Sequence, residues 1–592
     1  MQEPVDGPMD EIEKPVASPE GGVWGSDVIA TMLQRLGYRH VTLNPGASFR
    51  GLHDSLVNHI GNRDPQMILC LHEGNAVAIA HGYAKVSGQP MAVVLHSNVG
   101  LMNGSMGLFN AWCDRVPMMV LGATGPVDAA SRRPWIDWLH TMSDQAALVR
   151  PFLKWDNQPA SIPAAVEALL RANLLTRSAP RGPVYVNLDA ALQEARLDAM
   201  PALPDVSRYQ PPPAPVPAPA AIAQAVAMLR AAKAPLILAG RATRSTRDWA
   251  RRVALAEALG ARVLTDFRVG AAFPTDHALH AAAPATFLGE AGQAALRAAD
   301  CVLAFDWVDL AGTLKQASGM TARVIHASLD QHLHNGFGME HYGLAPVDLP
   351  LSCEPDIALH AIADALGVGP GVEPGDLPAC PALPPVAPET KLDVASLSAA
   401  LGEGLRGVPA CLVRLPLGWR GETWHFRHPL DYLGGDGGAG IGAGPGMLAG
   451  AALALQGTGR LPVGVLGDGD TLMSATAIWT AAHYRIPMLA VICNNRSFYN
   501  DEVHQERVAK LRNRPVENKW IGQRIADPDI DIAALARAQG ATGIGPVHTA
   551  GELVAAVREA VTLVQGGATV LIDARVAPGY NPAMAAALTR HP

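Results

Sequence analysis

Charged and aromatic residues are scarce in this 592-residue chain, at 17% and 5%, and long hydrophobic runs are missing. No stretch reaches the roughly 18 uninterrupted apolar residues of a membrane-spanning helix. Residues 1–20 are acidic and contain proline, whereas a secretory signal begins basic and continues apolar. A net charge of −8 gives no basic field for a polyanion. We therefore expect a cytoplasmic protein that has no membrane or nucleic-acid partner and acts on small metabolites.

Cysteine pairs at metal-binding or disulfide spacing are also lacking. The chain has seven cysteines, an odd number, with no CxxC pair and no histidines at zinc spacing beside them. Such a pattern argues against both a disulfide framework and a structural zinc site. We expect these thiols to be buried.

Proline, by contrast, is concentrated in two stretches, residues 201–219 and 369–388, which are too rich in proline for a helix or a central strand. They are typical of interdomain linkers. A chain of this length exceeds what one hydrophobic core supports, so roughly three domains are expected. The predicted segments are a mobile acidic head at 1–22 and domains at 23–200, 212–368 and 390–580.

Short apolar runs alternate with helical-looking stretches in all three predicted domains. This alternation indicates βα units and parallel sheets, and therefore an α/β protein with three doubly wound parallel-sheet domains. Ligands of such sheets bind at the carboxyl ends of the strands, so residues just after the runs carry the most functional interest. The runs are 91–96, 118–123 and 184–189 in the first domain, 236–240, 302–306 and 323–328 in the second, and 463–468, 489–494 and 570–576 in the third.

The strongest chemical pattern follows two of these runs. Gly467-Asp468-Gly469 ends one strand, and Asn494-Asn495 ends the next after residues 470–493. Adjacent parallel strands bring such tips together, and carboxylate and amide oxygens are ligands that Mg²⁺ shares with phosphates. The GDG turn alone is common, but the pair at this spacing indicates a magnesium-diphosphate site.

The residues around this turn complete the predicted site. The two glycines let the backbone approach a diphosphate, and a helix beginning near Asp470 and Thr471 directs its N–H groups toward the phosphates. The predicted cofactor contacts are Gly467, Asp468, Gly469, Asp470, Thr471 and Asn495.

This constellation resembles the motif shared by thiamine diphosphate-dependent enzymes. The resemblance implies thiamine diphosphate and Mg²⁺ as cofactors, with the metal held by Asp468, Asn495 and the backbone carbonyl of Ser497. Arg496 stands where the family often has glycine. The resemblance also names the domains: the first binds the pyrimidine, the second is central and the third binds the diphosphate and magnesium.

Enzymes of this family need a glutamate that protonates the cofactor's pyrimidine. The apolar run 67–73 ends in Glu73, and a helix of small residues begins at Gly74, so Glu73 is the candidate. Its alternative role is that of an ordinary acidic residue at a helix start, favoured by the helix dipole. In the glycine-rich stretch 434–446, the family match makes Ile441 the apolar wedge under the cofactor, and no acidic residue follows as a nucleotide-binding finger requires.

Within the family, the chain is most similar to the 2-oxo acid decarboxylase and carboligase group, in particular to benzoylformate decarboxylases. The carrying stretches include NPGASF from Asn44, LHEGNAVAIAHGYAKVSGQP, LHSNVGLMNGSMGLFNAW and GDGDTLMSATAIWTAAHYRIP. The resemblance makes His96 a residue that handles protons on the intermediate, since imidazole titrates near neutral pH. The family serine that contacts the substrate carboxylate is replaced by Ala47, with Ser48 next to it.

These matches predict non-oxidative decarboxylation of a 2-oxo acid or analogue, with carboligation as a second outcome. An acetolactate-synthase-like or acyl-CoA lyase-like carboligase is the first alternative, favoured by Ala47 and by the basic segment 500–524, which is either a mobile lid or a solvated helix. A non-catalytic structural or regulatory subunit is the alternative of another class.

The family implies a homodimer or homotetramer with active sites at the subunit interface. FAD is left open because some relatives carry it, but no motif demands it.

Overall fold

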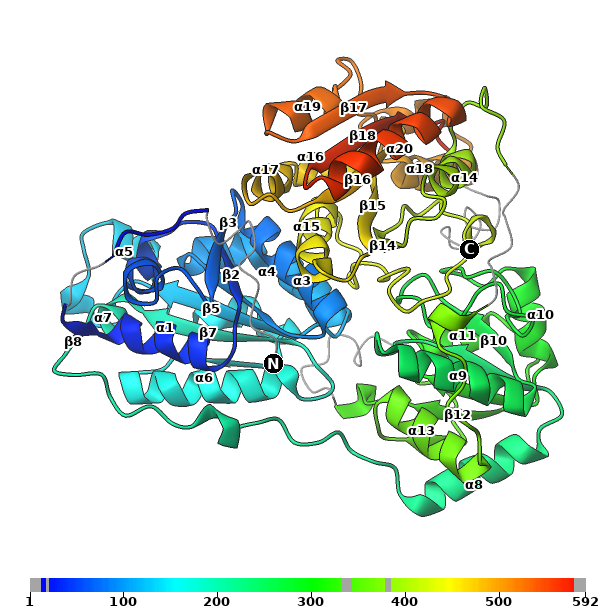
Figure 1. Cartoon of the computed structure of the whole chain (residues 1–592), viewed down its shortest axis with the longest axis horizontal. Coiled ribbons are helices and arrows are strands. Elements are labelled where there is room, and N and C mark those ends of the chain that lie inside the picture. The colour runs from blue at the N-terminus through cyan, green and yellow to red at the C-terminus, as the bar shows by residue number, and fades with distance from the viewer. Residues whose placement is uncertain (1–11, 18–20, 333–342, 378–384, 580–592) are drawn as a thin grey trace.

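The computed structural model describes residues 12–17, 21–332, 343–377 and 385–579. Three α/β units follow one another along the chain, coloured blue to cyan, green, and yellow to red in Figure 1. Most of the predicted acidic head lies outside the described residues. Within these ranges, no helix is long and apolar enough to cross a membrane.

The first unit contains a six-stranded sheet in the order β3-β2-β4-β5-β7-β6, and every neighbouring pair in it is parallel. A short antiparallel pair, β1 with β8, lies beside it. The strands are β1 Val23–Trp24, β2 His40–Leu43, β3 Gln66–Leu69, β4 Met91–Leu95, β5 Met118–Thr124, β6 Trp155–Asn157, β7 Pro183–Asp189 and β8 Arg196–Leu197. The helices are α1 Gly25–Arg35, α2 Arg50–Asp54, α3 Glu73–Ser87, α4 Ser97–Cys113, α5 Ile136–Leu139, α6 Ile162–Arg177 and α7 Ala190–Gln193.

The second unit is a five-stranded parallel sheet in the order β10-β9-β11-β12-β13. Its strands are β9 Pro235–Ala239, β10 Arg262–Thr265, β11 Cys301–Phe305, β12 Arg323–Ala327 and β13 Leu349–Leu351. Its helices are α8 Pro219–Ala231, α9 Thr246–Leu259, α10 Glu290–Ala298, α11 Leu310–Lys315 and α13 Pro355–Leu366.

The third unit is a five-stranded parallel sheet in the order β14-β15-β16-β18-β17. Its strands are β14 Ala410–Arg414, β15 Leu461–Gly467, β16 Met488–Asn494, β17 Thr542–Val547 and β18 Thr569–Arg575. Its helices are α14 Val394–Gly404, α15 Gly444–Leu455, α16 Asp468–Met473, α17 Thr476–His483, α18 Tyr499–Leu511, α19 Ile532–Ala538 and α20 Ala550–Gln565.

Both faces of the sheets are covered, as the continuous apolar runs predict. In β4, Val93 and Leu95 belong to one buried core, and Ala92 and Val94 belong to the core on the opposite face. Alternate residues of a strand point to opposite faces, so a run without polar residues needs helices on both sides. The predicted fold class, three doubly wound parallel sheets, is confirmed.

One hydrophobic core extends from the first unit into the third. It contains Ile68, Val93 and Leu95 from the first sheet together with Leu448 and Ile492 from the third unit. No layer of solvent separates side chains that belong to one buried cluster. The first and third units therefore pack as one body, although the second unit lies between them in the sequence.

Two helices meet across this shared core, α3 and α15, and Figure 1 shows them side by side. A Cβ atom built on Gly450 of α15 would lie 1.8 Å from the carbonyl oxygen of Ile79, and one on Gly82 of α3 would lie 2.0 Å from that of Met447. The helix backbones are in direct contact, so the spacing leaves no room for a side chain. We call this contact the α3–α15 seam.

The end of β3 differs from the expected strand. The apolar run was predicted to continue to Glu73, but the strand stops at Leu69 and α3 begins at Glu73. The hydroxyl of Tyr484 accepts from the Leu69 N–H at 2.8 Å, and the Thr480 hydroxyl donates to the Leu69 carbonyl at 3.0 Å. Side chains of the third unit thus bond the last strand residue, and the chain turns into the helix.

The other predicted segments are mostly as expected. Residues 201–218 contain one short 3₁₀ helix, η7 Val206–Arg208, before α8 begins at Pro219. The segment 500–524 forms most of α18 and the 3₁₀ helix η11 Val516–Trp520. Glu506 pairs with both Lys510 and Lys519 at 2.5 Å, which is typical of a solvated charged helix.

The seam predicts a specific loss of stability. We expect Gly450→Ala to lower the free energy of unfolding by about 2–3 kcal/mol, because the new methyl group meets backbone atoms that cannot move aside. Denaturant unfolding measures this. Gly369→Ala is the matched control: a Cβ there has no neighbour within 4 Å, so its unfolding free energy should stay within about 0.5 kcal/mol of the wild type. Equal stability of the two variants would contradict a close-packed seam.

Candidate active site

The structure brings the predicted metal ligands together at the carboxyl edge of the third sheet. β15 and β16 are adjacent and parallel, with Gly467 beside Cys493, so Asp468 and Asn495 leave the sheet side by side. The backbone N–H of Ser497 donates to Asp468 Oδ2 at 3.2 Å and to Asn495 Oδ1 at 2.9 Å. Two oxygens of the predicted ligand set therefore converge on one point.

The chemistry of this oxygen set suits a hard divalent cation. Asp468 is buried, and burial raises the pKa of its carboxyl group even though the backbone N–H groups of Gly469, Arg496 and Ser497 lower it. A cation would favour the charged carboxylate here. Carboxylate, amide and carbonyl oxygens are the ligands that Mg²⁺ takes in proteins. The residues present therefore fit the magnesium ion that the sequence predicts.

The loop after Asn495 explains the family's glycine preference. Arg496 has a φ of +58°, in the left-handed region that glycine adopts more easily than other residues. Its side chain reaches Asp529, with Nη1 3.2 Å from Oδ2. The loop therefore keeps its turn with arginine in place of glycine, and the neighbouring ligands stay in register.

Asp470, predicted as a cofactor contact, has another set of partners in the structure. Its Oδ1 accepts from the backbone N–H groups of Gly442 at 2.6 Å and Gly444 at 3.3 Å. Both glycines follow Ile441, whose side chain is 44% exposed. The carboxylate thus ties the loop of Ile441 to the turn that carries Asp468. The Thr471 hydroxyl is also used internally, since it donates to the Gly467 carbonyl at 2.8 Å.

Glu73 begins α3 in the first unit and is 6% exposed. Asn103 of α4 donates to Glu73 Oε2 at 3.0 Å. The side chain of His72 caps the helix by accepting from the Gly74 N–H at 3.0 Å. Glu73 is therefore a buried carboxyl group held at a helix start, as predicted for a proton-holding residue.

His96 lies close to Glu73. A Cβ built on Gly100 would be 3.1 Å from Glu73 Oε1 and 3.3 Å from His96 Cβ, so the two side chains flank the same glycine. Burial lowers the pKa of His96, the nearby His140 lowers it further, and Glu73 raises it. The two predicted catalytic residues thus lie next to each other in the first unit.

The neighbouring candidates Ala47 and Ser48 separate in the structure. Ala47 is exposed, whereas Ser48 is buried and its hydroxyl lies 2.8 Å from His96 Nδ1. Ser48 therefore orients His96, and its contact with a substrate carboxylate stays a prediction. Sequence reasoning missed His140, which lies outside the matched stretches, and Asn103, which lies in the stretch LHSNVGLMNGSMGLFNAW but was given no role.

Helix α4 links the two groups of candidates. Asn110 exchanges hydrogen bonds with Gly440: its amide donates to the Gly440 carbonyl at 3.2 Å and accepts from the Gly440 N–H at 3.3 Å. The helix that starts beside His96 thus also holds the loop of Ile441. Residues of the first unit and the loop of Ile441 are joined through this one element.

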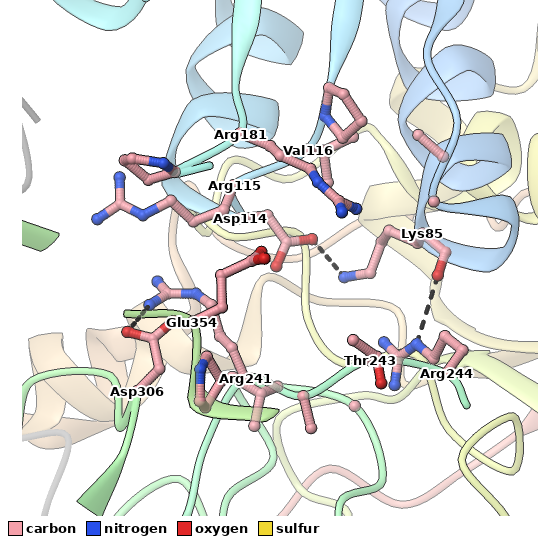
Figure 2. A pocket seen from close by; sticks show the side chains of 18 of the residues that line it. Lys85, Asp114, Arg115, Val116, Arg181, Arg241, Thr243, Arg244, Asp306 and Glu354 are labelled. Carbon is pink, nitrogen blue, oxygen red and sulfur yellow. Dashed lines mark hydrogen bonds and ion pairs between the residues drawn. The ribbon is translucent and has the colours of Figure 1, made fainter. Parts of the chain in front are cut away.

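A cavity of about 400 Å³ lies apart from these residues, between the first and second units. Figure 2 shows that its walls carry charged side chains of both signs, among them Lys85, Asp114 and Arg241. Several are paired: Lys85 with Asp114 at 2.5 Å, Arg241 with Asp306 at 3.6 Å, and Arg115 with Asp330 at 2.7 Å. Of these ion pairs, Arg115 with Asp330 joins the first unit to the carboxyl edge of the second sheet, and the other two lie within one unit each.

Comparison with known proteins identifies the family of this chain and several of its relatives. Three family models match: the N-terminal TPP binding domain of thiamine pyrophosphate enzymes at residues 23–148, their central domain at 222–337, and their C-terminal TPP binding domain at 417–574. The models follow the order of the three sheets.

Individual relatives have low sequence identity to this chain. The benzoylformate decarboxylase of Pseudomonas aeruginosa is 26% identical over 465 residues, 74% of this chain and 80% of the relative. A rice protein described as probable acetolactate synthase 2, chloroplastic, is 24% identical over 518 residues, 81% of this chain and 72% of the relative. A probable 2-ketoarginine decarboxylase of Pseudomonas aeruginosa is 25% identical over 293 residues, 49% of each chain.

Solved structures share the fold. The thiamine diphosphate-dependent 4-hydroxybenzoylformate decarboxylase of Rhodococcus jostii RHA1 superposes with a TM-score of 0.74 at 22% identity, over 94% of this chain and 100% of the other. Benzoylformate decarboxylase from Polynucleobacter necessarius gives 0.73 at 21% identity, over 94% and 99%. With three consecutive family models matched, the chain belongs to the thiamine pyrophosphate enzyme family.

Proposed function

We propose that this protein is a thiamine diphosphate- and Mg²⁺-dependent enzyme that decarboxylates a 2-oxo acid without oxidation and can pass the product to an aldehyde. The observation that carries the proposal is the placement of Glu73 and His96 on the two sides of Gly100. A buried carboxyl group and an imidazole next to it are the pair that proton transfer beside a carbonyl requires. The decarboxylases among the relatives support this reaction class.

The residues of the third unit would hold the cofactor by its charged end. Asp468, Asn495 and the Ser497 carbonyl would bind Mg²⁺, while Gly467, Gly469 and the start of α16 would lie at the diphosphate. Asp470 holds the loop of Ile441, and Ile441 would contact the organic part of the cofactor. When bound, thiamine diphosphate supplies the carbon nucleophile and the electron sink that loss of CO₂ needs.

The chain's own residues supply the proton chemistry. Glu73 holds a proton on its carboxyl group, and the Asn103 amide fixes Oε2 by donating to it. His96 presents an imidazole to the reacting group, with Ser48 holding its Nδ1. Glu73 is buried and His96 is half-buried, which limits the access of water to the proton positions.

An assembly of at least two copies would complete the site. Apolar side chains of α4 that are 40–50% exposed lie near these residues, namely Val99, Met102 and Met106. Contacts around Gly440 and Gly442 place Met106 and the exposed Met473 beside the loop of Ile441. Exposed apolar patches of this kind mark interaction surfaces. They support a homodimer or homotetramer in which Glu73 of one subunit serves the diphosphate site of another.

A carboligase of acetolactate-synthase type or acyl-CoA lyase type is the second candidate, favoured by Ala47 in place of the carboxylate-binding serine. The basic segment 500–524 gives it less support than the sequence implies, because Lys510 and Lys519 pair with Glu506 and Arg524 lies over the ring of Trp520. Product analysis with pyruvate separates the two reactions. The complete set of Glu73, Asp468 and Asn495 argues against a non-catalytic subunit, and no step of the proposal requires FAD.

Substitution of the proton-holding glutamate tests the proposal. Glu73→Gln should release CO₂ from pyruvate, benzoylformate, phenylpyruvate and branched 2-oxo acids at least about 100-fold more slowly than the wild type, because an amide cannot exchange the proton. Binding of thiamine diphosphate, measured by calorimetry, should persist because the diphosphate anchor is intact. Glu167→Gln, on the exposed face of α6, is the control and should retain full rate. Equal CO₂ release by wild type and Glu73→Gln would refute the mechanism.

Substitution of Asp468, a predicted metal ligand, gives an independent test. Asp468→Asn should weaken the binding of thiamine diphosphate in the presence of Mg²⁺ by at least about 10-fold, since the neutral amide attracts the cation less strongly. Calorimetric titration with and without EDTA checks this. Asp501→Asn, an exposed acid of α18, should bind like the wild type. If neither EDTA nor Asp468→Asn changed the affinity for thiamine diphosphate, the diphosphate would bind elsewhere in the protein.

A further inference from the structure

A second histidine faces His96 in the first unit. The ring centroids of His96 and His140 are 4.7 Å apart, and the rings are nearly perpendicular at 83°. His140 follows α5, in the segment that leaves the carboxyl end of β5. The predicted catalytic histidine is thus one of a pair, and the proposed function has so far used only one member.

The segment that carries His140 is fixed at several points. The His140 carbonyl accepts from the Gly125 N–H at 3.1 Å, and the Leu139 carbonyl accepts from the Asn98 amide of α4 at 3.2 Å. Asp137 pairs with Arg133 at 2.8 Å and accepts through its carbonyl from the Thr141 hydroxyl at 2.6 Å. His140 is therefore held opposite His96 by both β5 and α4.

Two residues beside the pair have unusual backbone angles. Ser97 has a φ of +42°, and Trp135 has a φ of +64° with a ψ of −63°. Non-glycine residues in such regions cost about 1–3 kcal/mol each and are found where the surrounding structure demands them. The Ser97 N–H donates to the Ser48 hydroxyl at 3.2 Å, so this strained turn also orients the serine that bonds His96.

The hydrogen bonds of His96 define its tautomer. The Ser48 hydroxyl lies 2.8 Å from Nδ1, and the Ser48 backbone N–H points at the same atom from 3.5 Å. Because a backbone N–H can only donate, Nδ1 serves as the acceptor. The ring hydrogen of neutral His96 is then on Nε2, and a second proton on Nδ1 would meet the Ser48 N–H.

We propose that His96 works as a neutral Nε2–H donor, and that His140 keeps it uncharged by opposing its protonation. His140 is a positioning residue in this scheme, since it acts on the reacting group through His96. The role in catalysis rests on the proposed function, but the charge state of His96 belongs to the protein alone. No bond other than N–H forms or breaks.

The charges that face the two histidines agree with a neutral His96. Glu73 on α3 is the carboxyl group that attracts a proton toward His96, and Ser48 and Ser97 are neutral. On the segment of His140, Arg133 and Asp137 cancel each other's charge as an ion pair. Burial and His140 outweigh Glu73, so the pKa of His96 lies below its ordinary value. A neutral imidazole can still polarise a carbonyl by donating from Nε2, as a hydrogen-bond donor aimed at developing charge.

Histidine-labelled apoprotein tests the pair by NMR titration between pH 5 and 8, with the His96 signal assigned from its loss in His96→Gln. In the wild type, His96 should titrate below the ordinary pKa of an imidazole. In His140→Gln it should titrate at least about half a pH unit higher than in the wild type, because the repulsion is gone. His140→Lys, which places a positive charge at this position, should lower the titration of His96 again. His53→Gln, on α2 of the same unit, is the matched control and should leave His96 unchanged.

The holoenzyme gives the second readout. In His140→Gln, the acid limb of the pH profile of kcat/KM should move to higher pH while the plateau changes little, whereas a purely structural role would lower the rate at every pH. An identical His96 titration in wild type and His140→Gln would overturn the inference. If the wild type decarboxylated no 2-oxo acid, the proposed function would fail, and the NMR titration would still decide the state of the pair.

Discussion

The close contact between the backbones of α3 and α15 is the constraint on which the site depends. Helix α3 begins at Glu73, and α15 begins directly after the loop of Ile441. Because glycines let these helices touch, small errors in their spacing are not absorbed by flexible side chains. Within one chain, the carboxyl group of Glu73 and the loop of Ile441 are therefore positioned by one rigid contact, and Asn110 of α4 adds a second connection through Gly440.

Burial acts in the same direction at both ends of the site, since it disfavours the charged form of Asp468 and of His96. What differs is the compensation that each end offers. Beside Asp468 lie backbone N–H groups and the amide oxygen of Asn495, and a bound metal would favour the carboxylate. Beside His96 the neighbours are a hydrogen-bonded serine and a second imidazole, which reinforce neutrality. One physical effect thus prepares one end for an ion and the other for an uncharged donor.

The sequence was sufficient for the architecture and for the residues that follow strands. Apolar runs such as 489–494 became buried parallel strands because both faces are covered, and Asp468 and Asn495 met because their strands are neighbours. Local patterns carried less information about contacts between distant segments. The early end of β3 depends on Tyr484, the role of Asp470 depends on the loop around Ile441, and His140 lies in a loop without periodicity. These features arise from tertiary contacts that no spacing encodes.

The core shared by the first and third units has a consequence for biosynthesis. On the ribosome, β3, β4 and α3 emerge long before Leu448 and Ile492, which complete the same buried cluster. Until the last third of the chain has been translated, one face of the nascent first sheet keeps its valines and leucines uncovered. Such intermediates are prone to aggregate and are natural clients of chaperones. Truncated products of this polypeptide would carry the same exposed surface permanently.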